Sequence, residues 1–186
     1  MKNENFNQKS FLDKLGLDIS QDNYEESIQR LQQLCIYNPF QAQQFIQIYL
    51  NAWCFKIQSM LNNKSFNVAG SRIRSLYMLV IYNKVFNRLI TIYFDKIKQE
   101  KFFQTLENYH RTIHLSMESQ YFYQKGQYDE AEKSVIKCFE GIKKNFNNKS
   151  HLNDSWLLIR KCLKNINDKE KAEVLLKEIL HNIVNN

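Results

Sequence analysis

The chain has 186 residues, of which 44% are hydrophobic and 13% aromatic, so it is long enough to bury a sizeable core. Its formal net charge is +7, and it contains only one proline and four glycines. So few turn-forming residues exclude an all-β sandwich or barrel, and the widely spaced glycines exclude a glycine-rich phosphate loop. We therefore expect an all-α protein.

The polarity and the capping signals of the N-terminal segment predict where ordered structure begins. Residues 1–9 are polar and are expected to form a flexible tail, and residues 10–186 are expected to form one domain. A short apolar turn is predicted to end at Gly16. Asp22 and Glu25 have the spacing of a capping box, which predicts the start of a helix.

Two longer helices are predicted next. Pro39 is expected to end the capping-box helix, because proline cannot continue a helix. A helix over residues 40–61 follows, and its predicted buried face repeats every three or four residues: Phe45, Ile48, Tyr49, Ala52, Trp53, Ile57 and Met60. Residues 67–98 read as one long helix that is apolar nearly all round, which predicts a buried central helix.

Four further helices complete the predicted chain. They cover residues 102–125, residues 128–144, residues 151–166 and a last segment that begins at Asn167. Gly126 is predicted to close the turn between the first two, and Asn167 with Glu170 has capping-box spacing. About seven helices result, arranged either as an irregular array of helical hairpins or as a helical bundle.

Two segments share a turn-and-helix pattern. In one, which runs from Ser119 to Cys138, Gly126 reverses the chain, Tyr128 follows two residues later, and Ala131 is small enough for two helices to approach closely. The other runs from Asp22 to Pro39. This pattern resembles the turn and second helix of a tetratricopeptide repeat. The resemblance implies a tetratricopeptide-like array of paired helices.

The surroundings of the four cysteines in the sequence indicate the cellular compartment of the protein. Each stands alone among apolar residues with helical spacing, which predicts buried free thiols in a reducing environment: Cys35, Cys54, Cys138 and Cys162. The first nine residues contain no apolar signal-peptide core, and no stretch is apolar enough to span a membrane. We therefore expect an intracellular protein, cytoplasmic or nuclear, that has no membrane contact.

Basic residues are concentrated in two segments, residues 66–101 and residues 142–164. Such segments neutralise phosphates, meet an acidic protein or simply confer solubility. If they meet nucleic acid, we expect a weak contact through nine residues: Arg72, Arg74, Lys84, Arg88, Lys143, Lys144, Arg160, Lys161 and Lys164.

Candidate chemistry is sparse in this sequence. Glu107, His110, His114 and Glu118 share one predicted helix face, with spacing that carboxylate–histidine metal sites use. No matching second motif accompanies them, so a solvated face is the simpler interpretation and no metal or cofactor is expected. No nucleophile motif is present either, and we therefore expect no catalytic residues, no small-molecule substrate and no enzymatic activity.

The aromatic residues suggest a partner surface. Because Tyr121, Phe122 and Tyr123 are consecutive, a helix must turn at least one of them outward. The candidate partner-binding residues are Tyr121, Tyr123, Trp53 and Tyr82, and core packing is the alternative role for each. The expected function is a helical scaffold or adaptor subunit of a multiprotein complex. The alternative is an accessory nucleic-acid-binding subunit of an RNA- or DNA-processing complex.

Overall fold

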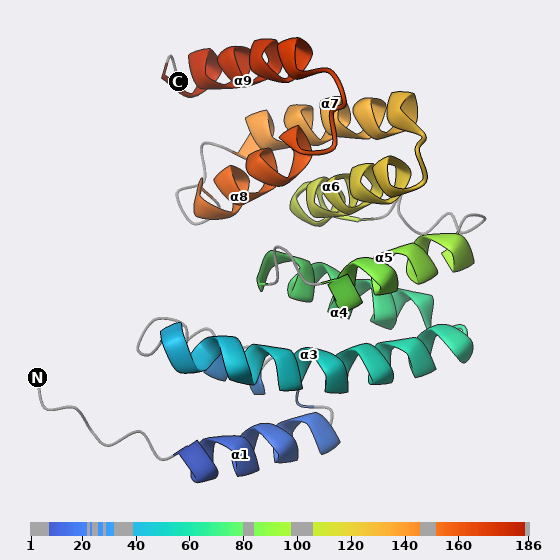
Figure 1. The fold of residues 1–186 in the computed structure, drawn as a ribbon, viewed down its shortest axis with the longest axis vertical. Helices are drawn as coiled ribbons and strands as arrows, with labels where there is room; N and C mark the ends of the chain where they lie inside the picture. The colour runs from blue at the N-terminus through green and yellow to red at the C-terminus, as the bar shows by residue number, and fades with distance from the viewer. Residues whose placement is uncertain are drawn as a thin grey trace, which may run out of the picture. The chain divides into compact units, whose positions relative to one another are not determined.

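The computed structural model describes residues 8–21, 23, 26–27, 29–31, 39–79, 84–97, 106–145 and 152–184. All the regular elements within these residues are helices, which confirms the predicted all-α class (Figure 1). The chain divides into two compact units, a first unit of residues 1–65 and a second unit of residues 66–186. The sequence had suggested one domain after a tail. Of that tail, the structure describes Gln8 and Lys9, which belong to the first helix.

The first unit contains α1 (Gln8–Ser20), which packs against α3 (Pro39–Asn62). Helix α1 continues through Gly16, so the helix end predicted there is wrong. A glycine inside a helix lowers its stability by only about 1 kcal/mol relative to alanine, and a helix as long as α1 can include one. The capping pair Asp22 and Glu25 lies outside the described residues.

Helix α3 differs from its prediction at its start and in its buried face. Pro39 is its first residue, where the missing N–H of proline costs nothing, and this places the proline at a helix start rather than a helix end. The buried side is formed by Tyr49, Leu50, Trp53, Cys54, Ile57 and Leu61. Leu50, Cys54 and Leu61 rotate that side away from Ile48, which is 58% exposed although it was predicted to be buried.

The second unit begins with two helices where the sequence predicted one. Helix α4 (Phe66–Leu79) and helix α5 (Lys84–Ile97) pack against each other as separate elements. Each has its own buried side, with Ile73 and Leu76 on α4 and Phe86 and Ile90 on α5. When residues 67–98 are projected onto one helix, the buried sides of α4 and α5 point in different directions and together look apolar all round. This explains the wrong prediction of a single central helix.

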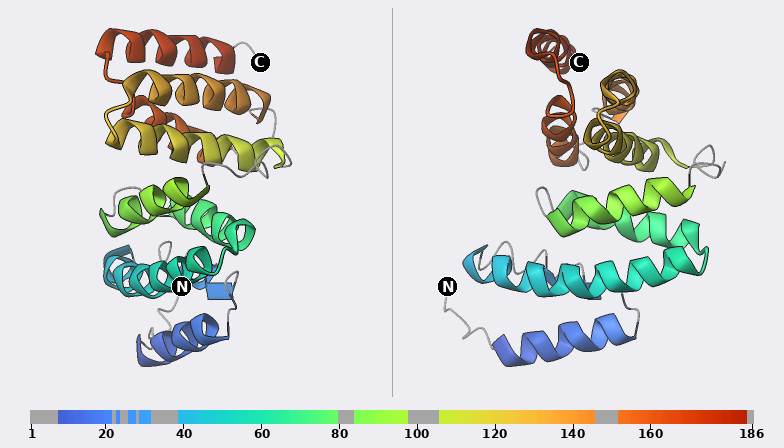
Figure 2. Two further views of the ribbon diagram at one scale, coloured as in Figure 1. Left: turned by 90° about the vertical axis from the view of Figure 1, so that its right-hand side faces the viewer. Right: turned by 45° about the vertical axis from the view of Figure 1, so that its right-hand side comes forward.

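Helices α6 (Asn108–Gln124) and α7 (Tyr128–Asn145) form the antiparallel hairpin that was predicted to close at Gly126 (Figures 1 and 2). Gly126 has a φ of 72°, a conformation that suits glycine, and the N–H of Gln127 donates to the carbonyl of Phe122 at 2.9 Å. Ala131 is fully buried in α7, as expected of a small residue in a close helix pair. Helix α6 begins at Asn108 rather than at residue 102, and residues 101–105 lie outside the described chain.

The last two helices are α8 (Leu152–Leu163) and α9 (Lys169–Val184). The cap of α9 is Asp168 rather than Asn167, because a carboxylate oxygen of Asp168 accepts the backbone N–H of Lys171 at 3.2 Å. Lys143 of α7 and Glu178 of α9 form an ion pair of 2.6 Å that joins these two helices.

The packing order of the second unit identifies its architecture. Each helix from α4 to α7 packs against the following helix, and α4, α6 and α7 also pack against the helix two places on. Figure 2 shows the same succession of paired helices in two further views. This order is that of two consecutive helical hairpins, α4 with α5 and α6 with α7, followed by α8 and α9, which both pack against α7. Of the two predicted arrangements, it favours the hairpin array over the bundle.

Candidate functional site

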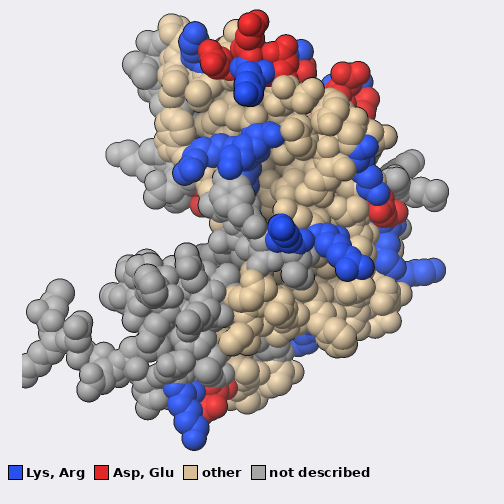
Figure 3. All heavy atoms as spheres, viewed as in Figure 1, with Lys and Arg blue, Asp and Glu red and all other residues tan. Residues whose placement is uncertain are grey.

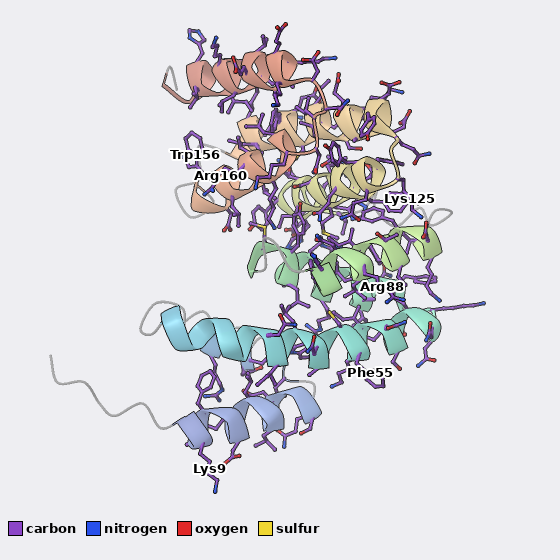
Figure 4. All side chains as sticks on the ribbon, in the orientation of Figure 1. Lys9, Phe55, Arg88, Lys125, Trp156 and Arg160 are labelled. Carbon is purple, nitrogen blue, oxygen red and sulfur yellow. The ribbon has the colours of Figure 1, made fainter. Side chains whose placement is uncertain are left out.

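An exposed apolar stripe on α3 is formed by Ile48 and Phe55. Their exposed fractions are 58% and 79%, and they stand seven residues apart, which places them two turns apart on one face. Figure 4 shows Phe55 on this helix. Because the opposite side of α3 carries the buried residues, the stripe has two large apolar side chains in solvent rather than in the core.

Two of the four aromatic residues predicted to bind a partner are interior. Trp53 is fully buried and Tyr121 is 3% exposed, so neither belongs to the exposed patch that the sequence suggested. The ring of Tyr121 stacks on Phe94 at 5.2 Å, and its hydroxyl donates to Asp95 at 2.8 Å, which fixes it between α5 and α6. Tyr123 is half-buried, and Tyr82 lies outside the described residues.

Phe55 was missed because the sequence pattern did not separate exposed aromatic residues from aromatic residues of the core. A signal was present: Phe55 follows Trp53 and Cys54, so it cannot share the face on which both of them are buried.

Two of the nine basic candidates, Arg74 and Lys161, are buried. The ammonium group of Lys161 donates to the carbonyl oxygen of Tyr77 and lies 3.3 Å from the centre of its ring. Burial lowers the pKa of Lys161 to about 7, and burial also lowers the pKa of Arg74. Neither side chain is placed to meet a phosphate backbone.

The remaining basic candidates are distributed over several helices. Lys84, Arg88, Lys144, Arg160 and Lys164 are exposed, whereas Arg72 and Lys143 are half-buried and Lys143 is paired with Glu178. Figure 3 shows Lys and Arg side chains over α5 and again over the α7–α8 region, and Figure 4 places Arg88 on α5 and Arg160 on α8. Lys84 and Arg88 are one turn apart on α5, as predicted.

A basic pocket lies between α6 and α7. Its volume is about 240 Å³, and its lining residues are Asn108, Arg111, Thr112, Leu115, Lys137, Glu140, Gly141 and Lys144. Three cationic side chains and one carboxylate give it an excess of positive charge. Arg111 and Lys137 were not among the predicted site residues, because neither lies in the two basic segments, and only the hairpin brings them together with Lys144.

The predicted histidine–carboxylate face is divided between surface and core. His110 is exposed, but His114 is buried against Phe94, with 4.9 Å between ring centres. Burial lowers the pKa of His114 to about 3, so its imidazole is neutral at physiological pH. Glu118 accepts a hydrogen bond from Ser134 at 2.8 Å. Over the described residues, no group of three or more metal-ligating side chains is found.

Three of the four cysteines are buried free thiols, which confirms the prediction for them: Cys54, Cys138 and Cys162. Cys35 lies outside the described residues. Cys138 of α7 and Cys162 of α8 bring their sulfur atoms to 3.4 Å. Their large separation in sequence gave no indication of this contact.

Comparison with known proteins adds no relative: no family model, no curated protein and no solved structure matches the chain. In the described part of the chain, no helix is both long enough and apolar enough to cross a membrane.

Proposed function

We propose that this chain is a non-catalytic interaction protein, a helical scaffold or adaptor subunit of a larger complex, and that the exposed apolar stripe binds a protein partner. The observation that carries the proposal is the 79% exposure of Phe55. Aromatic side chains are enriched in the buried centres of protein interfaces, and exposed apolar groups that gather on one face mark such surfaces. Ile48, on the same face of α3, extends the apolar area to two turns of the helix.

The architecture of the second unit supports the same function. In an array of hairpins, each hairpin packs only against the adjacent ones, so many helix faces remain available to other molecules. The tetratricopeptide-like pattern at Gly126 and Ala131 lies in the α6–α7 hairpin, where close helix packing gives the pattern a physical role.

The test is co-purification of partners with tagged chain from the cells that make it. The double variant Ile48→Glu with Phe55→Glu is compared with Gln58→Glu, a matched change at an exposed polar position of the same helix. The double variant should lose the co-purifying protein, and Gln58→Glu should retain it. Because all three side chains are exposed, unfolding free energies should change by only about 0.5 kcal/mol.

Two results would contradict the proposal. One is recovery of the same partner, in the same amount, with the double variant. The other is recovery of the wild-type chain alone under conditions that preserve known complexes of the same cells.

Nucleic-acid binding as an accessory subunit is the second candidate, favoured by the basic pocket and by Lys84 and Arg88 on α5. Fluorescence anisotropy of a labelled oligonucleotide, measured over a series of salt concentrations, tests it. Phosphate contacts predict weak binding, with a dissociation constant on the order of 10⁻⁴–10⁻⁶ M that rises steeply with salt. Binding that does not change with salt would rule out this candidate.

A further inference from the structure

A buried sulfur pair, Cys138 and Cys162, joins two adjacent helices of the second unit. Cys138 lies on α7 and Cys162 on α8, both side chains are fully buried, and their sulfur atoms are 3.4 Å apart. A disulfide has a sulfur–sulfur distance of about 2.05 Å, so each sulfur needs to move by less than about 1 Å to form one. Movements of this size lie within the thermal fluctuation of packed side chains.

The surroundings of the pair make its two thiols unequal. Burial raises the pKa of Cys138, and its thiol lies 3.4 Å from the carbonyl oxygen of Thr112. Burial also opposes ionisation of Cys162, but hydrogen bonding with Cys138, Ser116 and Ser119 and the charge of Lys161 lower the pKa of its thiol below the usual range. Two thiols in contact, with a cationic side chain beside one of them, can serve as an attacking and a resolving cysteine.

Polar neighbours hold this arrangement in place. The Ser116 hydroxyl is hydrogen-bonded to the Tyr77 hydroxyl at 2.9 Å, and the Asn165 amide donates to the Ser119 hydroxyl at 2.8 Å. The hydroxyls beside Cys162 are thus fixed from both α4 and the turn after α8, rather than free to rotate away. An apolar core would pack two thiols equally well without these polar groups, which are costly to bury.

We propose that Cys138 and Cys162 are a peroxide-oxidisable pair that forms a reversible disulfide between α7 and α8. The thiolate of Cys162 attacks one oxygen of hydrogen peroxide, the O–O bond breaks, and a sulfenic acid and hydroxide form. The hydroxide takes the proton that Cys162 released and leaves as water. The thiol of Cys138 then attacks the sulfenic sulfur, the S–S bond forms, and the sulfenic oxygen leaves as a second water with the proton of Cys138. Two thiols are oxidised by two electrons and one peroxide is reduced to two waters.

The disulfide would change how the α6–α7 hairpin is connected to α8. It would join α7 covalently to α8, which otherwise packs against α7 only through non-covalent contacts. Because both sulfur atoms are buried, peroxide reaches them by local opening of α8, a helix of 12 residues. Oxidation therefore fixes the contact between the α6–α7 hairpin and α8, and reduction releases it. This inference does not depend on the proposed partner surface.

The experiment uses the full chain, purified in reduced form and treated with hydrogen peroxide without denaturant. Remaining thiols are then alkylated in denaturant, and the intact mass and the peptide map are measured. We expect a chain that has lost two hydrogen atoms, carries alkyl groups on two of its four cysteines, and yields a linked Cys138–Cys162 peptide that dithiothreitol separates. Alkylation of all four cysteines, a linkage through Cys54, or oxidation beyond the sulfenic acid without a link would overturn the proposal.

Variants assign the roles of the two cysteines. Cys162→Ala should form no intramolecular disulfide, whereas Cys54→Ala, which removes a buried thiol of the first unit, should form it at the wild-type rate. In Cys138→Ala the sulfenic acid has no resolving thiol, so dimedone should label Cys162. Absence of that label in a variant with wild-type circular dichroism would overturn the assignment of Cys162 as the attacking thiol. The peptide map of the wild-type chain decides the pairing even where a variant fails to fold.

Discussion

Replacing Gly141 of α7 by alanine should destabilise the second unit, although alanine is the better helix former. An added Cβ would collide with the hydroxyl oxygen of Thr112 on α6 and would lie 3.3 Å from its Cβ. The Thr112 hydroxyl donates to the carbonyl of Asn108 at 2.7 Å, and a rotation that removes the collision breaks this bond. The two helices must therefore separate, or Thr112 must change its rotamer.

The size of the effect follows from two opposing contributions. Alanine gains about 1 kcal/mol over glycine in a helix interior. Forcing an extra methyl group into a packed contact costs about 1–3 kcal/mol. Gly141→Ala should thus lower the free energy of unfolding by up to about 2 kcal/mol, whereas Gly16→Ala should raise it by about 0.5–1 kcal/mol, because a Cβ at Gly16 meets no atom within 4 Å.

Urea unfolding followed by circular dichroism measures both variants, and a double variant tests the cause. Thr112→Ala removes the colliding atoms, so the cost of Gly141→Ala should become a gain in the Thr112→Ala background. Equal stabilisation by Gly141→Ala and Gly16→Ala would refute the close approach of α6 and α7. A cost of Gly141→Ala that persists unchanged in the Thr112→Ala background would refute Thr112 as its source.

Three further predictions concern the hairpin, the buried lysine and the exposed cations. Ala131→Leu should overpack α7 against α6 and lower the free energy of unfolding by about 1–3 kcal/mol, and an unchanged urea midpoint would contradict this. The pKa of Lys161 is lowered to about 7 in the folded chain and is near 10.4 in the unfolded chain. Between these two pH values, Lys161 carries a proton in the unfolded chain that it lacks in the folded chain. The stability of the wild type relative to Lys161→Met should therefore rise with pH from about 7 to about 10, and a constant difference would contradict the burial of that charge. Lys84→Glu with Arg88→Glu should abolish weak, salt-sensitive oligonucleotide binding without shifting the unfolding midpoint, and undiminished binding would exclude α5 from the contact.

The α6–α7 hairpin was predictable because its determinants are local. Gly126 supplies the positive φ that the turn requires, and Ala131 supplies the small surface that the helix contact requires. The division into α4 and α5 was not predictable from the same signals, because no glycine or proline separates them and only Asn83 and Lys84 stand between their apolar residues. Only the packing of one helix against the other shows that two amphipathic surfaces are present.

The helical positions of Arg74, His114 and Lys161 indicated burial. Their polar or charged side chains nevertheless favoured a prediction of surface positions. Arg74 stands four residues after Gly70 and three before Tyr77, and Lys161 stands three residues after Leu158, so both occupy the apolar register of their helices. His114 likewise lies three residues before Met117. Charged side chains are seldom buried, and this general tendency favoured a surface position for each. The contact between Cys138 and Cys162 depends on tertiary packing alone.

The hydrodynamic size of the chain in an extract of the cells that make it shows whether the chain belongs to a larger complex. Size-exclusion chromatography of the extract, with the chain detected by antibody, is compared with the purified chain of 22.4 kDa on the same column. A scaffold or adaptor subunit predicts that the chain in the extract elutes earlier than the purified chain, and that Ile48→Glu with Phe55→Glu returns it to the later position. Coelution of the wild-type chain in the extract with the purified chain would contradict a role as a subunit of a larger complex.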